Sequence, residues 1–251
     1  MVHDLLLILA GVAGGFCNTF AAGGSIVQIP VLVGLGLHPM IANTTNHVPV
    51  LVGFAAAIWR FHRQKTMPWG VGFKISIPMV FGSVLGALTA SIINDRMTVY
   101  VLFAALLLAM ALMLAKPNRW LRNEEGDECL DLAPKLYFFS LLIGFWTGLI
   151  VIGSGVFLLL TLVLVAHFRV TQANAIKVLS LGIAGLLAVL VFTIKGQIIW
   201  SSAIPLSMGS IIGSLIAAKL VMRPNAGKWV YVLILLTLGT EIIRIGSKLF
   251  S

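Results

Sequence analysis

NTFAAGGS, residues 18–25, interrupts a run of apolar residues that extends from Leu5 to Leu37. The run is about 33 residues long, whereas one crossing of the ~30 Å hydrocarbon core needs about 20 residues. It is also too short for two full crossings joined by a turn. We therefore expect a helix that breaks at the paired glycines and restarts at Ser25. Irregular backbone at membrane depth persists only where protein surrounds it or where it lines a cavity.

A helix that restarts within the membrane presents free backbone N–H groups and the positive end of its dipole, and both attract an anion. A second interruption, residues 153–155, stands at the corresponding place in the second half of the chain. Broken helices in corresponding halves are the best sequence indication of a transporter's binding site. The backbone groups expected to hold the anion belong to Gly23, Gly24, Ser25, Gly153, Ser154 and Gly155.

The composition indicates an integral membrane protein. The 251 residues are 59% hydrophobic and only 10% charged, with a mean hydropathy of +1.06. A soluble domain of this size has no place to bury so much apolar sequence. Transmembrane β-barrels alternate polar and apolar residues with period two, and these runs do not, so we expect an all-α polytopic protein. Asp4 and the lack of a basic leader indicate a retained first helix rather than a cleaved signal peptide.

Charge, cysteines and motifs argue against several other classes of protein. The formal net charge of +9 is spread over connecting segments without a dense basic stretch, so we expect no nucleic-acid partner. The two cysteines, Cys17 and Cys129, suggest neither a metal site nor a disulfide framework. The sequence contains no H-E-x-x-H motif, no intramembrane aspartate pair and no P-loop. We therefore expect no cofactor, no bound metal and no enzymatic activity.

Residues 116–135 form the one soluble-looking segment of the chain and hold five of its eight acidic residues. We interpret this segment as a cytoplasmic linker between a first transmembrane repeat, residues 1–115, and a second, residues 136–251. The expected spans are 4–16 with 25–37, 41–59, 70–93, 97–115, 136–151 with 155–166, 172–193, 199–219 and 228–247.

The two halves resemble each other at ordered positions, which indicates an internal duplication. Most matches occur at one constant offset along the chain. In chain order they are residues 42–43 with 173–174, Trp69 with Trp200, and VYVL at 99–102 with VYVL at 230–233. Residues 82–86 and 209–213 match after a short deletion. Their small residues recur at a spacing that lets transmembrane helices approach closely, so we interpret this pattern as helix packing.

The topology depends on whether each broken element crosses the membrane. If each is a hairpin, each half crosses an odd number of times and the repeats are inverted. Loop Lys and Arg residues are then divided less evenly between the two sides than they are for parallel repeats, which favours inversion by the positive-inside rule. We therefore expect two inverted repeats, each with a broken or re-entrant first helix. The side expected to be cytoplasmic carries Arg60, Arg63, Lys65, the 116–135 linker, Arg169, Lys219, Arg223 and Lys228.

A polar stripe follows each broken element. Asn43, Asn46 and His47 are spaced so that they share one face of a helix, and Asn174 and Lys177 occupy the matching positions in the second half. Polar side chains within a membrane are costly unless they face a cavity or a partner. The functional interpretation is a central site in which amides and one ammonium surround an anion. The alternative is interhelical hydrogen bonding that holds the bundle together.

Two members of the stripe carry specific hypotheses. Lys177 lies about two turns into a span, and no acidic residue is expected beside it, so the missing counter-charge can be the substrate. His47 is a candidate for proton coupling because histidine titrates near neutral pH, although a neutral imidazole bonded to a neighbouring helix is the alternative. Phe20, Gln28 and Trp146 flank the breaks and are candidates for the pocket wall, with simple packing as the alternative.

The stretch AAGGSIVQIPVLVGLGLHPMIANTTN, residues 21–46, resembles the signature of the sulfite exporter TauE/SafE family, also called the 4-toluene sulfonate uptake permease family. The resemblance lies in a glycine-rich turn, Pro30, a glycine after an apolar run, Ala42, and the pair Thr45-Asn46. The second half keeps a degenerate copy, and the resemblance extends over essentially the whole chain. It implies secondary transport of small anions such as sulfite and organosulfonates, and we expect this to occur across the bacterial inner membrane. Protons are a candidate coupling ion because of His47. An anion channel and a carboxylate permease remain as alternatives.

Overall fold

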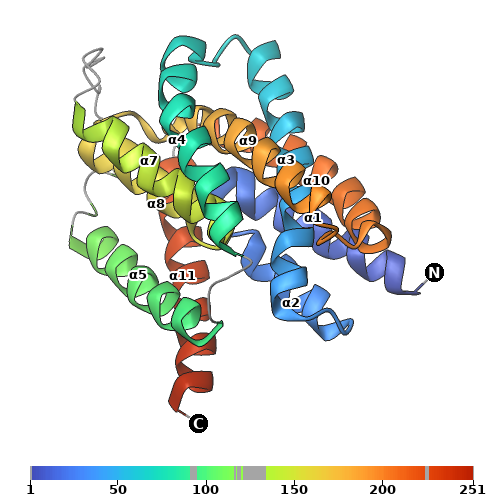
Figure 1. Ribbon diagram of the computed structural model, residues 1–251. Coiled ribbons are helices and arrows are strands. Elements are labelled where there is room, and N and C mark those ends of the chain that lie inside the picture. Colours follow the sequence, from blue (N-terminus) through green and yellow to red (C-terminus); the bar gives the residue numbers. More distant parts are fainter. Residues whose placement is uncertain are drawn as a thin grey trace.

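The computed structural model describes residues 2–90, 95–115, 117, 120, 134–223 and 226–250, and these form helices and their connections (Figure 1). Most of the expected linker, 116–135, lies outside the described residues, so the division of the chain there stays a prediction. The first half holds α1 (Val2–Ala21), α2 (Ser25–Gly34), α3 (Pro39–Arg63), α4 (Trp69–Ala90) and α5 (Asp95–Ala115). The second half holds α7 (Pro134–Leu149), α8 (Ser154–Leu160) with the π-helical turn η1 (Thr161–Val165), α9 (Val170–Ile194), α10 (Trp200–Leu220) and α11 (Ala226–Phe250).

Both halves therefore have the same order of elements: a long helix, a break, a short helix and three long helices. Six helices in the described ranges are long and apolar enough to cross a membrane, namely α1, α3, α4, α9, α10 and α11. Large apolar side chains such as Phe81, Leu108 and Ile243 are exposed on the outer surface, as expected of helices that face lipid. The expectation of an all-α polytopic membrane protein is confirmed.

The two halves interlock. The first helix of each half packs on the fourth helix of the other half, α1 on α10 and α7 on α4. The third helices, α3 and α9, contact each other and also pack on α10 and α4, respectively, while α5 and α11 pair at the side of the bundle (Figure 1). Since every major contact has a counterpart with the halves exchanged, the contact pattern has approximate two-fold symmetry. The apolar core therefore spans both halves.

Small residues allow the two reciprocal helix pairs to pack at backbone distance. A Cβ at Gly82 of α4 would overlap the carbonyl oxygen of Leu141 in α7. In the other pair, a Cβ at Gly209 of α10 would overlap the carbonyl oxygen of Ile8 in α1. Ser214 Oγ also donates to Gly15 O at 3.1 Å across this second interface. The packing interpretation of the repeated Gly-Ser pattern is thus confirmed.

Each broken element doubles back on itself. Gly24 lies against Gly14 and Asn18, and the Gln28 side chain also lies against Gly14, so α2 runs back along α1. In the second half, Trp146 Nε1 donates to Ile152 O at 2.9 Å, and its ring centroid lies 5.4 Å from that of Phe157, so α8 turns back toward α7.

The first break lies later in the chain than the expected span of 4–16 implied. Helix α1 continues to Ala21, because no residue in 17–21 stops it. The left-handed residue of the turn is Ala22, with φ of 66°, rather than Gly23 or Gly24. Gly24 is needed for close approach to α1, where a Cβ would overlap Gly14 O. In the second break the left-handed residue is Gly153, with φ of 81°.

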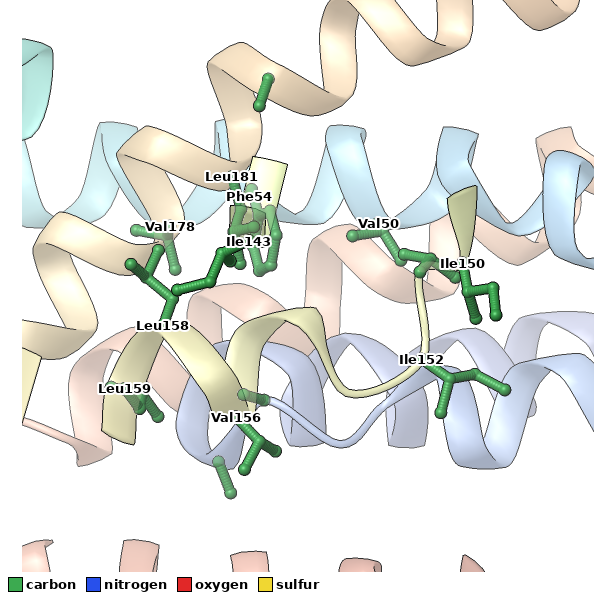
Figure 2. Close-up of a cluster of buried hydrophobic side chains, with 14 of the residues drawn as sticks. Val50, Phe54, Ile143, Ile150, Ile152, Val156, Leu158, Leu159, Val178 and Leu181 are labelled. Carbon is green, nitrogen blue, oxygen red and sulfur yellow. The ribbon is translucent and has the colours of Figure 1, made fainter. Parts of the chain in front are cut away.

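Helices α3 and α9 run antiparallel through the centre. The ring centroids of His47 and Phe192 lie 5.1 Å apart. Toward the other end of α3, a Cβ at Gly182 would lie 3.6 Å from Phe54 Cβ and 3.4 Å from Ile58 Cδ1. Figure 2 shows part of the buried apolar cluster here, with Phe54 of α3, Leu181 of α9 and Leu158 of α8. The C-terminal end of α3 therefore lies toward the N-terminal end of α9.

Candidate functional site

The two breaks meet inside the bundle. A Cβ at Gly155, in the first turn of α8, would lie 2.5 Å from Ala22 Cβ in the first break. Ala22, Ser25, Ser154 and Gly155 are all buried. The two breaks, residues 23–25 and 153–155, therefore lie in one region of the structure; that they hold an anion stays a prediction.

The contact between the breaks gives a compensation test. Gly155→Ala should destabilise the protein by about 1–3 kcal/mol, because the new methyl group would be forced against Ala22 Cβ. Ala22→Gly removes that atom and suits the φ of 66° at this residue. The double variant should therefore recover most of the lost stability, as measured by thermal unfolding of the four purified proteins. Additive losses would mean that the two turns do not touch.

Lys177 is fully buried and uses all three of its N–H donors. Its Nζ donates to Asn18 O at 2.9 Å, to Thr19 O at 3.0 Å and to Asn174 Oδ1 at 2.7 Å. The two carbonyl groups belong to the last turn of α1, whose dipole presents its negative end to a cation. Among the residues that the structure describes, Lys177 makes no ion pair, and Glu241 pairs with Arg244 instead. The ammonium is hydrogen-bonded, and no acidic side chain in the described ranges forms an ion pair with it.

Asn18 is a site residue that the sequence analysis did not assign. Its Oδ1 accepts a hydrogen bond from Gly24 N at 2.8 Å, which fixes the turn, while its backbone carbonyl accepts from Lys177. The Nδ2 groups of Asn18 and Asn174 and the Oγ1 of Thr19 are buried without a partner in the described part of the chain. The first break, Asn174 and Lys177 therefore form one polar cluster, which we call the first cluster.

Asn43 performs the corresponding task at the second break. Its Nδ2 donates to Leu149 O at 3.3 Å, and its Oδ1 accepts from Val151 N at 3.2 Å. The constant offset between the repeats pairs Asn43 with Asn174 and Leu149 with Asn18. In each half, therefore, the end of the broken helix is held by the middle helix of the other half. Asn43, the second break and the following turn of α3 form the second cluster.

Asn46 and His47 occupy that following turn and are nearly or fully buried. Both polar atoms of Asn46, together with Nε2 of His47, have no hydrogen-bond partner among the described residues. The offset pairs Asn46 with Lys177, whose longer side chain has all three of its donors paired. Because buried polar atoms in folded proteins are almost always paired, this concentration of unpaired atoms indicates a place for a ligand or water.

The polar stripe is divided between the two clusters. His47 contacts Phe192, and Phe192 lies about 20 Å along α9 from Lys177 at 1.5 Å per residue. Lys177 and Asn174 therefore lie at the first break, and Asn43, Asn46 and His47 lie toward the second. The antiparallel packing of α3 and α9 places the two ends of the stripe apart, and the touching breaks lie between them.

The second break leaves more backbone donors open than the first. In α8 the first backbone hydrogen bond runs from Phe157 N to Gly153 O, and the N–H groups of Ser154, Gly155 and Val156 have no acceptor in the described ranges. In the first break, Gly23 N and Gly24 N are already bonded, which leaves the amide of Ser25. The Ser154 hydroxyl is turned to Val151 O at 2.9 Å.

The three candidates for the pocket wall are largely engaged with protein. Phe20 stacks on Phe16 with a centroid separation of 5.4 Å, and Trp146 is held by Phe157 and Ile152 as described above. Gln28 is fully buried, donates from Nε2 to Ser210 Oγ at 2.9 Å, and leaves Oε1 unpaired. Of these three, Gln28 retains an open polar atom. No group of three His, Cys, Asp or Glu residues that could hold a metal ion occurs in the part of the chain that the structure describes.

Comparisons with known proteins agree with a transport function. A family model described as "Sulfite exporter TauE/SafE" matches residues 7–242. The chain is 30% identical over 228 residues to "Probable membrane transporter protein ORF9" of Sinorhizobium sp, which covers 88% of this chain and 84% of the relative. A "Probable membrane transporter protein" of Haemophilus influenzae is 30% identical over 226 residues, covering 87% and 86% of the two chains. "Probable membrane transporter protein YfcA" of Escherichia coli is 26% identical, covering 88% and 83%. No solved structure matches the chain.

Proposed function

The chain belongs to the sulfite exporter TauE/SafE family of membrane transporters, and on that premise we propose that it moves small organosulfonate or sulfite anions by secondary transport. It is a multi-pass protein of the bacterial inner membrane. The proposed substrate rests on the family description together with the chemistry of the two clusters. Both clusters offer hydrogen-bond donors, and Lys177 adds one positive charge to the first. No acidic side chain is among the residues that define either cluster.

The observation that carries the proposal is the buried, unpaired state of Asn46 beside the second break. An amide with both polar atoms free matches a ligand that both accepts and donates hydrogen bonds, such as a protonated sulfite or a hydroxyalkyl sulfonate. The open N–H groups of Ser154 and Gly155 add donors for a sulfonate oxygen. We assign the anionic head to this cluster, with Asn43 holding the turn in place.

Lys177 acts on the anion through its charge. Its three donors are occupied in this structure, so it supplies positive potential and fixes the end of α1 rather than bonding the anion directly. In a medium of low dielectric constant such a charge acts over longer distances than it does in water. Because the touching breaks lie between the clusters, we propose that the anion moves along them from one cluster toward the other.

Inverted repeats supply the route for alternating access. We propose that the two halves have opposite orientations in the membrane, which is supported by the hairpin form of both broken elements and by the antiparallel packing of α3 and α9. Repeats of this kind move by rocking around a central site. We also propose that His47, whose Nε2 is buried and unpaired next to Asn46, carries the coupling proton.

Replacing Asn46 by leucine tests the anion site. Leucine has a similar volume and removes two buried, unpaired polar atoms, so the unfolding temperature of the ligand-free protein should stay the same or rise. The stabilisation that a bound anion gives the wild type should be lost. The measurement is thermal unfolding of both purified proteins with sulfite, taurine, isethionate, toluenesulfonate, sulfate, malonate and chloride.

A fall in the unfolding temperature of ligand-free Asn46→Leu would instead mean that Asn46 is structural and not a ligand. The panel also separates the alternatives. Stabilisation of the wild type by malonate but not by any sulfur anion would favour a carboxylate permease. An anion channel would show conductance that does not depend on a proton gradient.

A further inference from the structure

A cavity of about 400 Å³ opens at the end of the molecule where α3 stops and α9 begins. Its polar lining comes from two loops and the first turn of α9, and its apolar lining includes two methionines. Its lining includes Lys65, Met67, Arg169, Thr171, Gln172 and Met222. Lys65 and Arg169 are both exposed cations, and the described lining contains no acidic side chain. The cavity is thus suited to an anion.

The cavity lies at the end of α9 that leads to the first cluster. Thr171 in its wall is three residues before Asn174, and residues at this spacing are neighbours on a helix surface. Asn174 in turn accepts the hydrogen bond from Lys177, whose other two bonds hold the end of α1. The separation between the cavity and the first break along this face of α9 is therefore about two turns of helix.

The equivalent place at the other end of the molecule is bridged by hydrogen bonds. There, Thr44 Oγ1 donates to Gln197 O, and Ile199 N donates to Thr45 Oγ1 at 3.1 Å. These bonds tie the start of α3 to the loop between α9 and α10. We call the end of the molecule that carries Thr44 and Thr45, with these two hydrogen bonds, the latched end.

The end of the molecule that carries the cavity lacks the residues that form these two hydrogen bonds. The constant offset pairs Thr44 and Thr45 with Ala175 and Ile176, which have no hydroxyl groups, and pairs Ile199 with Pro68, which has no backbone N–H. Neither of the two bonds can form there. The two ends of the molecule therefore differ in side-chain chemistry: hydrogen bonds join α3 to the α9–α10 loop at one end, and a cavity lies at the other.

We propose that this cavity is the cytoplasmic mouth of the anion path, and that Lys65 and Arg169 collect the transported anion there. The cytoplasmic side follows from the concentration of loop Lys and Arg residues at this end. Electrostatic attraction of this kind raises the local concentration of an anion and speeds its entry. The inference rests on the proposed transport of anions, but the mouth can be tested without knowing the substrate.

The test compares thiol labelling at Thr171→Cys in a background that lacks Cys17 and Cys129, using inside-out and right-side-out vesicles. The probes are two membrane-impermeant methanethiosulfonate reagents, one carrying a sulfonate and one carrying a quaternary ammonium group. The expected result is labelling from the cytoplasmic face only, with the sulfonate reagent favoured.

Lys65→Gln with Arg169→Gln should lower the ratio of sulfonate to ammonium labelling roughly tenfold at low salt. Lys219→Gln, which removes an exposed cation of α10 outside the cavity lining, is the matched control and should leave the ratio unchanged.

Three results would overturn the inference: equal ratios with and without the two cations, labelling from the outer face, or a ratio that depends on anionic lipid in the vesicles. The last would mean that a lipid headgroup occupies the cavity. A second position, Gln197→Cys, lies at the latched end and should resist both reagents from either face. Because neither reagent is the substrate, this experiment can succeed even if sulfonate transport fails, so the two proposals can be judged separately.

Discussion

Lys177→Met should weaken the stabilisation of the protein by its anionic ligand. The substitution keeps a long flexible side chain but removes the buried positive charge, which has no acidic partner among the described residues. At an effective dielectric constant of about 20, a unit charge contributes about 1 kcal/mol to the binding of an anion ~20 Å away, and more at shorter range, which is roughly fivefold in affinity. The anion affinity should therefore fall by at least that factor in a titration followed by thermal unfolding or calorimetry.

The same substitution should also lower the stability of the ligand-free protein. Asn18 O, Thr19 O and Asn174 Oδ1 all lose their ammonium donor, and a buried acceptor left unpaired costs about 1–3 kcal/mol. Lys177→Arg separates charge from geometry, because it keeps the positive charge and should keep a measurable anion response. Lys74→Met is the matched control, since Lys74 is also within a span but exposed. An unchanged anion affinity in folded Lys177→Met would remove Lys177 from the site.

Gly24→Ala should prevent the first hairpin from closing. A methyl group at this residue would overlap Gly14 O and lie 2.6 Å from Asn18 Cγ, and both belong to α1. If the backbone of α1 shifts to remove this overlap, its contact with α10 is loosened. If α2 shifts instead, the hydrogen bond from Gly24 N to Asn18 Oδ1 is broken. We expect a loss of about 3 kcal/mol or more, measured as a drop in unfolding temperature and in the yield of monodisperse protein in detergent.

Gly34→Ala is the control for this prediction. Gly34 ends the same short helix, and a Cβ there would meet nothing within 4 Å. Its effect on stability should stay within about 0.5 kcal/mol. If Gly24→Ala behaved like Gly34→Ala, α2 would not fold back on α1 and the hairpin form of the first break would be wrong.

Much of the architecture could be predicted from the sequence because the membrane restricts the options. The length of the first apolar run and the glycines at 23–24 require a break, and the repeated Gly-Ser pattern identifies two helices, α4 and α10, that pack closely against others. The extent of α1 could not be predicted, since the glycines serve close packing rather than ending the helix. The left-handed residue of the turn is Ala22, and alanine carries no sequence signal for that conformation.

The site was predictable only as a set of residue types. The polar stripe and the lack of an acid near Lys177 were visible in the sequence, and Asn18, a polar residue just before the break, could have been assigned on the same grounds. The partners of Lys177 could not be found, because two of them are backbone carbonyls and any residue supplies these. The separation of Asn46 from Lys177 depends on where the antiparallel helices α3 and α9 contact each other along their length, which the offset between repeats does not reveal.

Transport by the purified protein in proteoliposomes tests the central proposal most directly. The measurement is uptake of sulfite and isethionate against a concentration gradient, with an imposed proton gradient and with a protonophore as control. The proposal predicts saturable accumulation of at least one sulfur anion, its loss when the proton gradient is collapsed, and its reduction in Lys177→Met. Flux no greater than in protein-free liposomes for every anion, or a conductance that continues after the gradient is collapsed, would contradict it.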